Sequence, residues 1–287
     1  MDLSSELKKA DAPAGQAGNG AAADEAMRRA GPRRFRGVPL RVLIPNLITL
    51  LALCLGLTAI RFALEDQIGW AVMAIAAAAV LDGLDGRIAR ALKGTSRFGA
   101  ELDSLADFVD FGVAPALVLY VFGLSQMRSL GWFAALVFAI ACALRLARFN
   151  VMIEDPNRPA WQSYFFVGMP APAGAITGLL PVYLHLSLLH VPRSPALAPF
   201  EIAYVLVIAS LMASRVPHFS GKSIGRVPRE YVAVVLFALA AGILLLANFP
   251  MEMLAATTLA YLAAIPFSIK RFEEMRRADD ARAAKAT

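Results

Sequence analysis

Long apolar stretches with few charges recur along most of this chain, and they restrict its fold more than any other feature. Several reach the roughly 20 residues that a helix needs to cross a bilayer. Hydrophobic residues make up 58% of the 287 positions, and the mean hydropathy is +0.59. A closed membrane barrel would instead show short segments of alternating polarity. The sequence therefore predicts an all-α, polytopic helical membrane protein.

Hydropathy predicts about eight transmembrane helices. Their expected ranges are 42–63, 69–91, 100–123, 131–152, 166–188, 199–214, 231–248 and 253–269, of which the sixth is the weakest prediction. Residues 1–36 are poor in apolar bulk, which predicts a disordered tail without a cleavable signal peptide. The expected organisation is this tail, a catalytic transmembrane core over 37–226, additional helices over 227–270 and a charged tail over 271–287.

The formal net charge of +6 is explained by membrane topology, and no nucleic-acid partner is expected. Basic residues gather in alternate connections and in the C-terminal tail, whereas the opposite connections carry only Arg61, Arg128 and Arg193. The positive-inside rule then places both termini on the cytoplasmic side. Cys54 and Cys142 lie inside apolar runs, so we expect small core residues and no disulfide.

Four aspartates stand near the cytoplasmic ends of the second and third expected helices. At about 100° per residue, Asp82 and Asp85 share one helix face, and Asp103 and Asp107 are one turn apart on the next helix. The short link between the two helices makes them antiparallel neighbours. The four carboxylates are therefore expected to converge just inside the cytoplasmic surface.

Four negative charges in one place require compensation, and hard divalent cations supply it. Ligation by oxygen alone suits Mg²⁺ or Mn²⁺, and Ca²⁺ is also compatible. Two helices that each provide two carboxylates can hold a pair of cations, as in two-metal phosphoryl-transfer sites. Gly86 and Gly99 leave room beside the cations, and Arg90 offers a guanidinium fork for a phosphate. The pattern predicts a site for a pyrophosphate presented at the membrane surface.

The full pattern reads Asp-x2-Asp-Gly-x2-Ala-Arg-x8-Gly-x3-Asp-x3-Asp, from Asp82 to Asp107. It resembles the signature of the CDP-alcohol phosphotransferase family at every fixed position. The resemblance implies a six-helix catalytic core, a CDP-linked lipid donor, an alcohol acceptor and release of CMP. It also implies a homodimer.

The resemblance assigns roles to individual residues. Asp82, Asp85 and Asp103 would hold one divalent cation, and Asp82, Asp103 and Asp107 the second. Asp107 would also be the general base that takes the proton of the acceptor hydroxyl. The residues that would contact the CDP-diacylglycerol donor are Pro45, Asn46, Leu47, Ile48, Gly86, Arg90 and Ser96.

The flanking stretches, among them "FGAELDSLADFVDFGVAPAL" and "SRVPHFSGKSIGR", resemble the bacterial membrane-type phosphatidylserine synthases of that family. This branch implies CDP-diacylglycerol and L-serine as substrates and the bacterial inner membrane as location. Arg145 and Arg148 are candidates for binding the serine carboxylate. Alternatively, both are topological charges or partners of lipid phosphate.

Other interpretations of the sequence stay open. A sister enzyme would use glycerol-3-phosphate, inositol phosphate or choline, and a different class of protein would be an ion-coupled transporter or a scaffold with a surface metal site. Asp110 is either support for the metal ligands or, as we favour, helix surface facing the cytoplasm. His218 is expected to stand alone in a loop. The last two spans are interpreted as packing or dimer contacts.

Overall fold

The computed structural model describes residues 40–94, 96–153, 165–192, 194–219 and 229–286. The expected N-terminal tail lies outside the described residues, and so does the end of the core at 220–226. The described chain is almost entirely helical, with one pair of short strands. The all-α prediction is confirmed.

Among the described residues, five helical stretches are long and apolar enough to cross a membrane. Four are single helices: α2 (Leu40–Leu64), α3 (Ile68–Ala91), α6 (Ser129–Ile153) and α11 (Pro250–Ala286). Large apolar side chains such as Leu47, Trp70 and Phe133 are exposed on their outer faces, as expected for helices that contact lipid. The polytopic membrane class is confirmed, whereas the count of eight spans is not.

The fifth stretch, Arg97–Phe122, consists of three segments in sequence. They are α4 (Arg97–Asp107), the π-helical η1 (Phe108–Val113) and α5 (Ala114–Phe122). Pro115 has no N–H, so the carbonyl four residues earlier loses its α-helical partner at the point where the wide turns occur. Such π turns are frequent at functional sites, and this one directly follows Asp107.

The expected fifth span is not a single helix. It contains β1 (Phe165–Val167), α7 (Ala171–Gly178) and α8 (Leu180–Leu186). Pro181 stands at the start of α8 and cannot donate a hydrogen bond back into α7, so the chain breaks there. Strand β1 pairs antiparallel with β2 (Pro217–Phe219), with Phe166 opposite His218.

The remaining elements are short. The apolar helices α9 (Ala198–Ala213) and α10 (Val232–Asn248) have 16 and 17 residues. Two 3₁₀ segments complete the described chain, η2 (Leu124–Met127) and η5 (Arg229–Tyr231). Helix α11 continues well beyond the expected span 253–269, through the charged C-terminal stretch.

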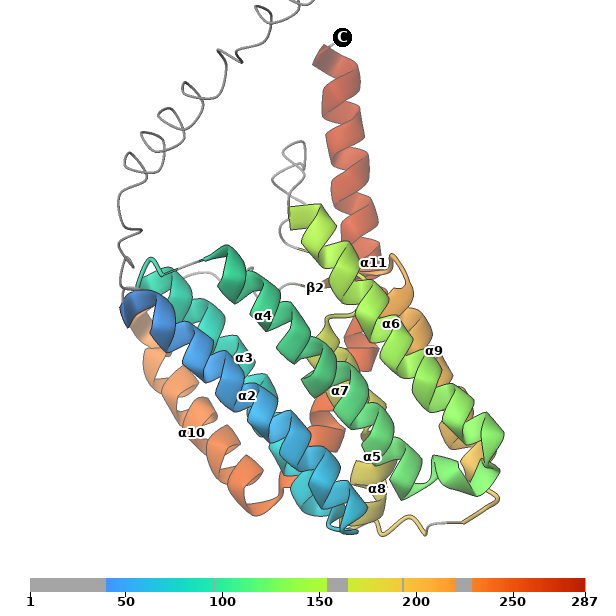
Figure 1. Cartoon of the computed structure of the whole chain (residues 1–287). Helices are drawn as coiled ribbons and strands as arrows, with labels where there is room; N and C mark the ends of the chain where they lie inside the picture. The colour runs from blue at the N-terminus through green and yellow to red at the C-terminus, as the bar shows by residue number, and fades with distance from the viewer. Residues whose placement is uncertain (1–39, 95, 154–164, 193, 220–228, 287) are drawn as a thin grey trace, which may run out of the picture. The chain divides into compact units, whose positions relative to one another are not determined.

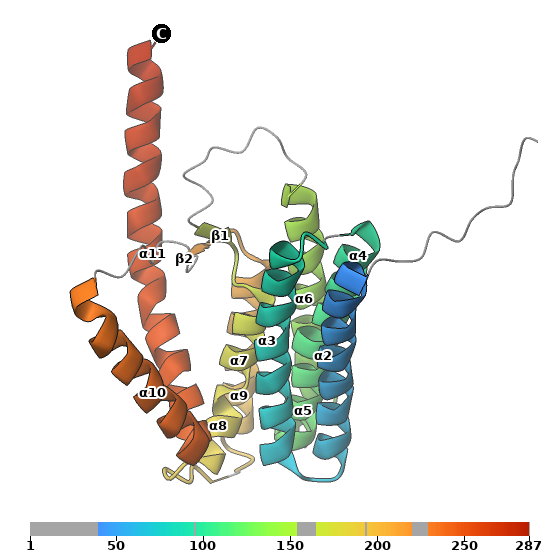
Figure 2. The same cartoon turned by 90° about the vertical axis from the view of Figure 1, so that its left-hand side faces the viewer.

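Helices α2, α3, α4–α5 and α6 lie side by side, and α9 packs against α6 (Figures 1 and 2). Small residues such as Ala71 and Ala78 are fully buried in α3 and allow α2 to approach closely. Phe111, Phe138 and Tyr183 are the largest side chains of the buried core. This packing fixes the N-terminal ends of α2 and α4 beside the C-terminal end of α3.

The prediction that both cysteines are core residues is confirmed for one and wrong for the other. Cys142 is a fully buried core residue, as expected, but Cys54 is exposed on α2. Both are free thiols. An apolar residue of a membrane helix has two apolar environments open to it, the protein core and the lipid, and hydropathy does not distinguish them.

Candidate metal and nucleotide-binding site

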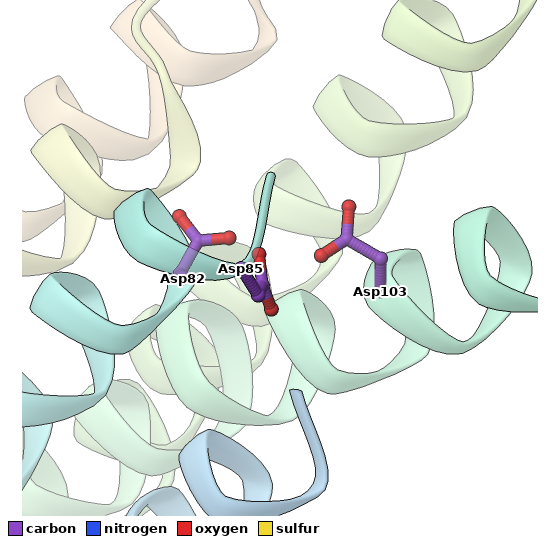
Figure 3. Close-up of side chains that lie close together, drawn as sticks. All are labelled: Asp82, Asp85 and Asp103. Atoms are coloured by element: carbon purple, nitrogen blue, oxygen red, sulfur yellow. The ribbon is translucent and has the colours of Figure 1, made fainter. Parts of the chain in front are cut away.

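Three aspartates form a compact carboxylate group at one end of the helices. Asp82 and Asp85 come from the last turns of α3, and Asp103 comes from α4. One oxygen from each lies within 4.8 Å of the others. Figure 3 shows the three carboxyl groups directed into the same space between the two helices. Three converging carboxylates fit a hard divalent metal ion, whose preferred ligands are oxygens.

Asp107 stands one helical turn beyond Asp103 and outside this group of three. Its carboxyl group interacts electrostatically with those of Asp82 and Asp103. Asp107 therefore adds a fourth carboxyl group beside the three-aspartate group.

Asp85 is the most buried of these four carboxylates, with 4% of its surface exposed. The hydroxyl of Thr49, on α2, donates a hydrogen bond of 2.6 Å to its Oδ2 atom. The same hydroxyl also lies 3.2 Å from the carbonyl oxygen of Pro45. A donor of this kind orients a ligand carboxylate. Thr49 was not predicted, because only the contact between α2 and α3 reveals its role.

A pocket of about 190 Å³ opens beside Asp85 and Asp103. Five of the seven residues expected to contact the CDP group line it: Pro45, Asn46, Gly86, Arg90 and Ser96. Leu47 and Ile48 do not line this pocket, and Leu47 is 65% exposed on α2. The pocket thus places a cationic guanidinium and several polar groups next to the carboxylates.

Gly99 makes the close approach of α2 and α4 possible. A Cβ atom at this position would lie 2.7 Å from Oδ1 of Asn46 and 3.1 Å from Oγ of Ser96. Ser96 caps α4, since its hydroxyl accepts a hydrogen bond of 3.0 Å from the Gly99 N–H. At Gly86, by contrast, the nearest side-chain atom that an added Cβ atom would meet is Nη1 of Arg90, at 3.9 Å. Gly86 therefore leaves open space in the pocket, as expected.

The two candidate acceptor arginines have different surroundings. Arg148 donates from Nη1 to the carbonyl oxygens of Ala213 and Ser214, at 2.7 and 2.9 Å, and so ties α6 to the end of α9. Arg145 is 7% exposed, and its guanidinium lies 5.1 Å from the ring centre of Phe149. Arg145 also interacts electrostatically with Asp107 and Asp82. Only Arg145 therefore faces the carboxylates.

Two interpretations of polar residues are wrong. Asp110 is not helix surface, because it is 1% exposed and lies so close to Gly56 that a Cβ atom there would collide with its carboxylate. The π-helical turns of η1 direct it inward against α2. His218 does not stand alone, because it belongs to β2 and contacts Tyr261 of α11. Both contacts join segments distant in sequence, so no local pattern indicated them.

Comparison with known proteins identifies a family whose model matches this chain. A family model described as CDP-alcohol phosphatidyltransferase matches residues 42–216, which include all four aspartates and both arginines. The matched range ends just before His218 and does not include α10 or α11.

Several relatives carry the name CDP-diacylglycerol–serine O-phosphatidyltransferase. The protein of that name from Mycobacterium leprae is 45% identical over 240 residues, which cover 83% of this chain and 78% of the relative. The one from Helicobacter pylori is 34% identical over 195 residues, covering 68% and 79%. The one from Bacillus subtilis is 35% identical over 176 residues, covering 61% and 90%.

Proposed function

Because the chain belongs to the CDP-alcohol phosphatidyltransferase family, we propose that it transfers the phosphatidyl group of CDP-diacylglycerol to the hydroxyl of L-serine. The products are phosphatidylserine and CMP. The observation that carries this proposal is the group of three carboxylates within 4.8 Å beside a pocket lined by Asn46, Arg90 and Ser96. The relatives' shared name supports the choice of substrates.

The carboxylates would hold two divalent cations, Mg²⁺ or Mn²⁺. Asp82, Asp85 and Asp103 would bind the first, and Asp82, Asp103 and Asp107 the second. When bound, the cations neutralise charge on the donor pyrophosphate and polarise its phosphorus–oxygen bonds. Thr49 keeps Asp85 oriented, and Arg90 is placed to contact a donor phosphate.

The transfer is an in-line displacement at the phosphorus that bears the diacylglycerol. The serine oxygen bonds to this phosphorus while the bond to the CMP oxygen breaks, and CMP leaves with the electron pair. Asp107 accepts the serine hydroxyl proton as general base. Its position one helical turn from Asp103 and beside Asp82 supports this role, because it places a carboxylate next to the proposed metal ligands. No phosphoenzyme intermediate is expected.

The location and assembly are part of the same proposal. The enzyme lies in the bacterial inner membrane with both termini and the site in the cytoplasm, as the distribution of basic residues predicts. The homodimer implied by the resemblance stays a prediction.

The test is an acceptor panel on purified protein in detergent, with CDP-diacylglycerol and Mn²⁺ or Mg²⁺, in which CMP release is followed. We expect release that requires L-serine and a divalent cation. Release with glycerol-3-phosphate, inositol phosphate or choline instead would move the protein to a sister branch. An absence of CMP with every acceptor would contradict a transferase and return attention to an ion-coupled transporter.

A further inference from the structure

Tyr261 of α11, which is half-buried, and His218 of β2, which is buried, form a polar pair outside the range matched by the family model. Their rings are stacked, with centroids 5.7 Å apart and planes inclined by 7°. The Tyr261 hydroxyl lies 3.0 Å from Nδ1 of His218, within hydrogen-bond distance. His218 is 1% exposed and is held in place by the pairing of β2 with β1. The geometry of Tyr261 is therefore fixed by both a ring contact and a hydrogen bond.

This pair extends to the reacting centre through Arg145. Tyr261 interacts electrostatically with Arg145 of α6, which in turn interacts with Asp107 and Asp82. Tyr261 and the proposed general base Asp107 thus both interact electrostatically with the same cation, Arg145. Arg145 and Tyr261 belong to α6 and α11. The residues that line the nucleotide pocket belong instead to α2, α3, α4 and the link between α3 and α4.

Three residues that interact with Tyr261 or share its helix face each have a buried polar atom without a hydrogen-bond partner within the described part of the chain. These atoms are Nε of Arg145, Nε2 of His218 and Oγ1 of Thr258. Thr258 precedes Tyr261 by three residues and therefore shares its helix face. Unpartnered buried polar groups are costly, and a ligand that bonds to them would remove that cost.

The character of these groups indicates an anionic ligand. Burial lowers the pKa of His218 to about 4, so its imidazole is neutral near pH 7. If Nδ1 accepts from the Tyr261 hydroxyl, His218 keeps an N–H on Nε2. If Nδ1 donates, the Tyr261 hydroxyl keeps its own proton. The second tautomer leaves the Tyr261 hydroxyl free to donate to a carboxylate that the Arg145 cation also attracts, and this is the tautomer that suits an anionic ligand.

We propose that Arg145 and Tyr261 bind the carboxylate of the amino-acid acceptor, that His218 positions Tyr261, and that α11 thereby contributes to acceptor specificity. This inference rests on the proposed function, because it names the part of the site that recognises serine. Arg148 is not part of this proposal, because its Nη1 atom donates to the carbonyl groups at the end of α9.

The test compares wild type with Tyr261→Phe, which removes the hydroxyl and retains the stacked ring. We expect the KM for L-serine to rise about tenfold, as for loss of a hydrogen bond to a charged group. The KM for CDP-diacylglycerol should stay unchanged. Serinol, which has the hydroxyl and amine of serine but no carboxylate, should react equally slowly with both proteins.

Tyr204→Phe is the matched control. It removes a phenolic hydroxyl that donates a 2.7 Å hydrogen bond to the carbonyl oxygen of Thr177, away from Arg145. This variant should keep the wild-type KM for L-serine. His218→Leu should reproduce the effect of Tyr261→Phe, and His218→Gln, which retains a hydrogen-bonding group, should recover part of the affinity for serine.

The outcomes separate the inference from the proposed function. Suppose that the wild type releases CMP with serine and that Tyr261→Phe has the same KM for serine as the wild type. This result would overturn the inference and leave the proposed function unaffected. An equal rise of KM for serine and CDP-diacylglycerol would assign Tyr261 a structural role and also overturn it. Wild type without serine-dependent CMP release would contradict both.

Discussion

At the scale of single residues, one hydroxyl holds the most buried carboxylate of the candidate metal site. Thr49 donates to Asp85 across the contact between α2 and α3. A carboxylate with 4% exposure has little access to water that could replace this donor. Loss of the hydroxyl would leave Asp85 free to turn away from Asp82 and Asp103.

Thr49→Val should therefore weaken metal binding by about tenfold, the lower end of the range for groups that orient metal ligands. The measurement is the Mn²⁺ concentration that gives half-maximal CMP release. Thr58→Val is the control, because Thr58 lies on the same helix and donates only to the Cys54 carbonyl at an exposed position. An unchanged Mn²⁺ requirement in Thr49→Val would show that Asp85 needs no such support.

Substitutions of Asp103 and of Asp107 are expected to impair the enzyme in different ways. Asp103→Asn should raise the metal requirement, since Asp103 belongs to the three-carboxylate group. Asp107→Asn should partly retain binding of metal and CDP-diacylglycerol while lowering kcat by at least about 100-fold, as for loss of a general base. Isothermal titration with Mn²⁺ and single-turnover CMP release distinguish the two effects.

Glu101→Gln serves as the control for both variants, because Glu101 is an exposed acid on the same helix α4. It should behave as wild type in both measurements. A wild-type rate in Asp107→Asn would remove the general-base role. Unchanged metal dependence in Asp103→Asn would contradict the two-metal site.

At the scale of elements, the separation of α2 and α4 shapes the nucleotide pocket, and Gly99 sets that separation. Gly99→Ala places a Cβ atom 2.7 Å from Asn46 Oδ1, so either the helix or the amide must move. We expect the KM for CDP-diacylglycerol to rise several-fold with little change in the KM for serine. Steady-state kinetics in both substrates measure this.

Gly69→Ala is the matched variant, since a Cβ atom at Gly69 meets nothing within 4 Å. It should leave both KM values unchanged. If Gly99→Ala raised neither KM, the contact between Gly99 and Asn46 would be irrelevant to donor binding.

Features that depend on residues close together in the sequence could be predicted, whereas features that depend on packing between distant segments could not. The aspartates could be placed on two helix faces because periodicity and a short link are local properties. The break between α7 and α8, the inward turn of Asp110 and the pairing of His218 with Tyr261 depend on packing between distant segments. Hydropathy reports apolar composition, so it merged α7 and α8 into one span and said nothing about the role of α11 beside Arg145.

At the scale of the whole molecule, the charge distribution predicts the orientation of the chain. Green fluorescent protein fused after residue 287 should fluoresce in a bacterial host, and alkaline phosphatase at the same position should be inactive. Fusions in the connection between α2 and α3, after Asp66, should give the opposite pattern. Active alkaline phosphatase at the C-terminus would place the aspartates on the outer side and contradict a cytoplasmic site.

The most direct test of the central claim is product identification after incubation of the purified enzyme with CDP-diacylglycerol, Mn²⁺ and ¹³C-labelled L-serine. Mass spectrometry should find the label in the head group of phosphatidylserine, in amounts equal to the CMP released, with neither product formed when the cation is chelated. CMP accompanied by unlabelled phosphatidic acid would mean hydrolysis without transfer to serine, and would contradict the account.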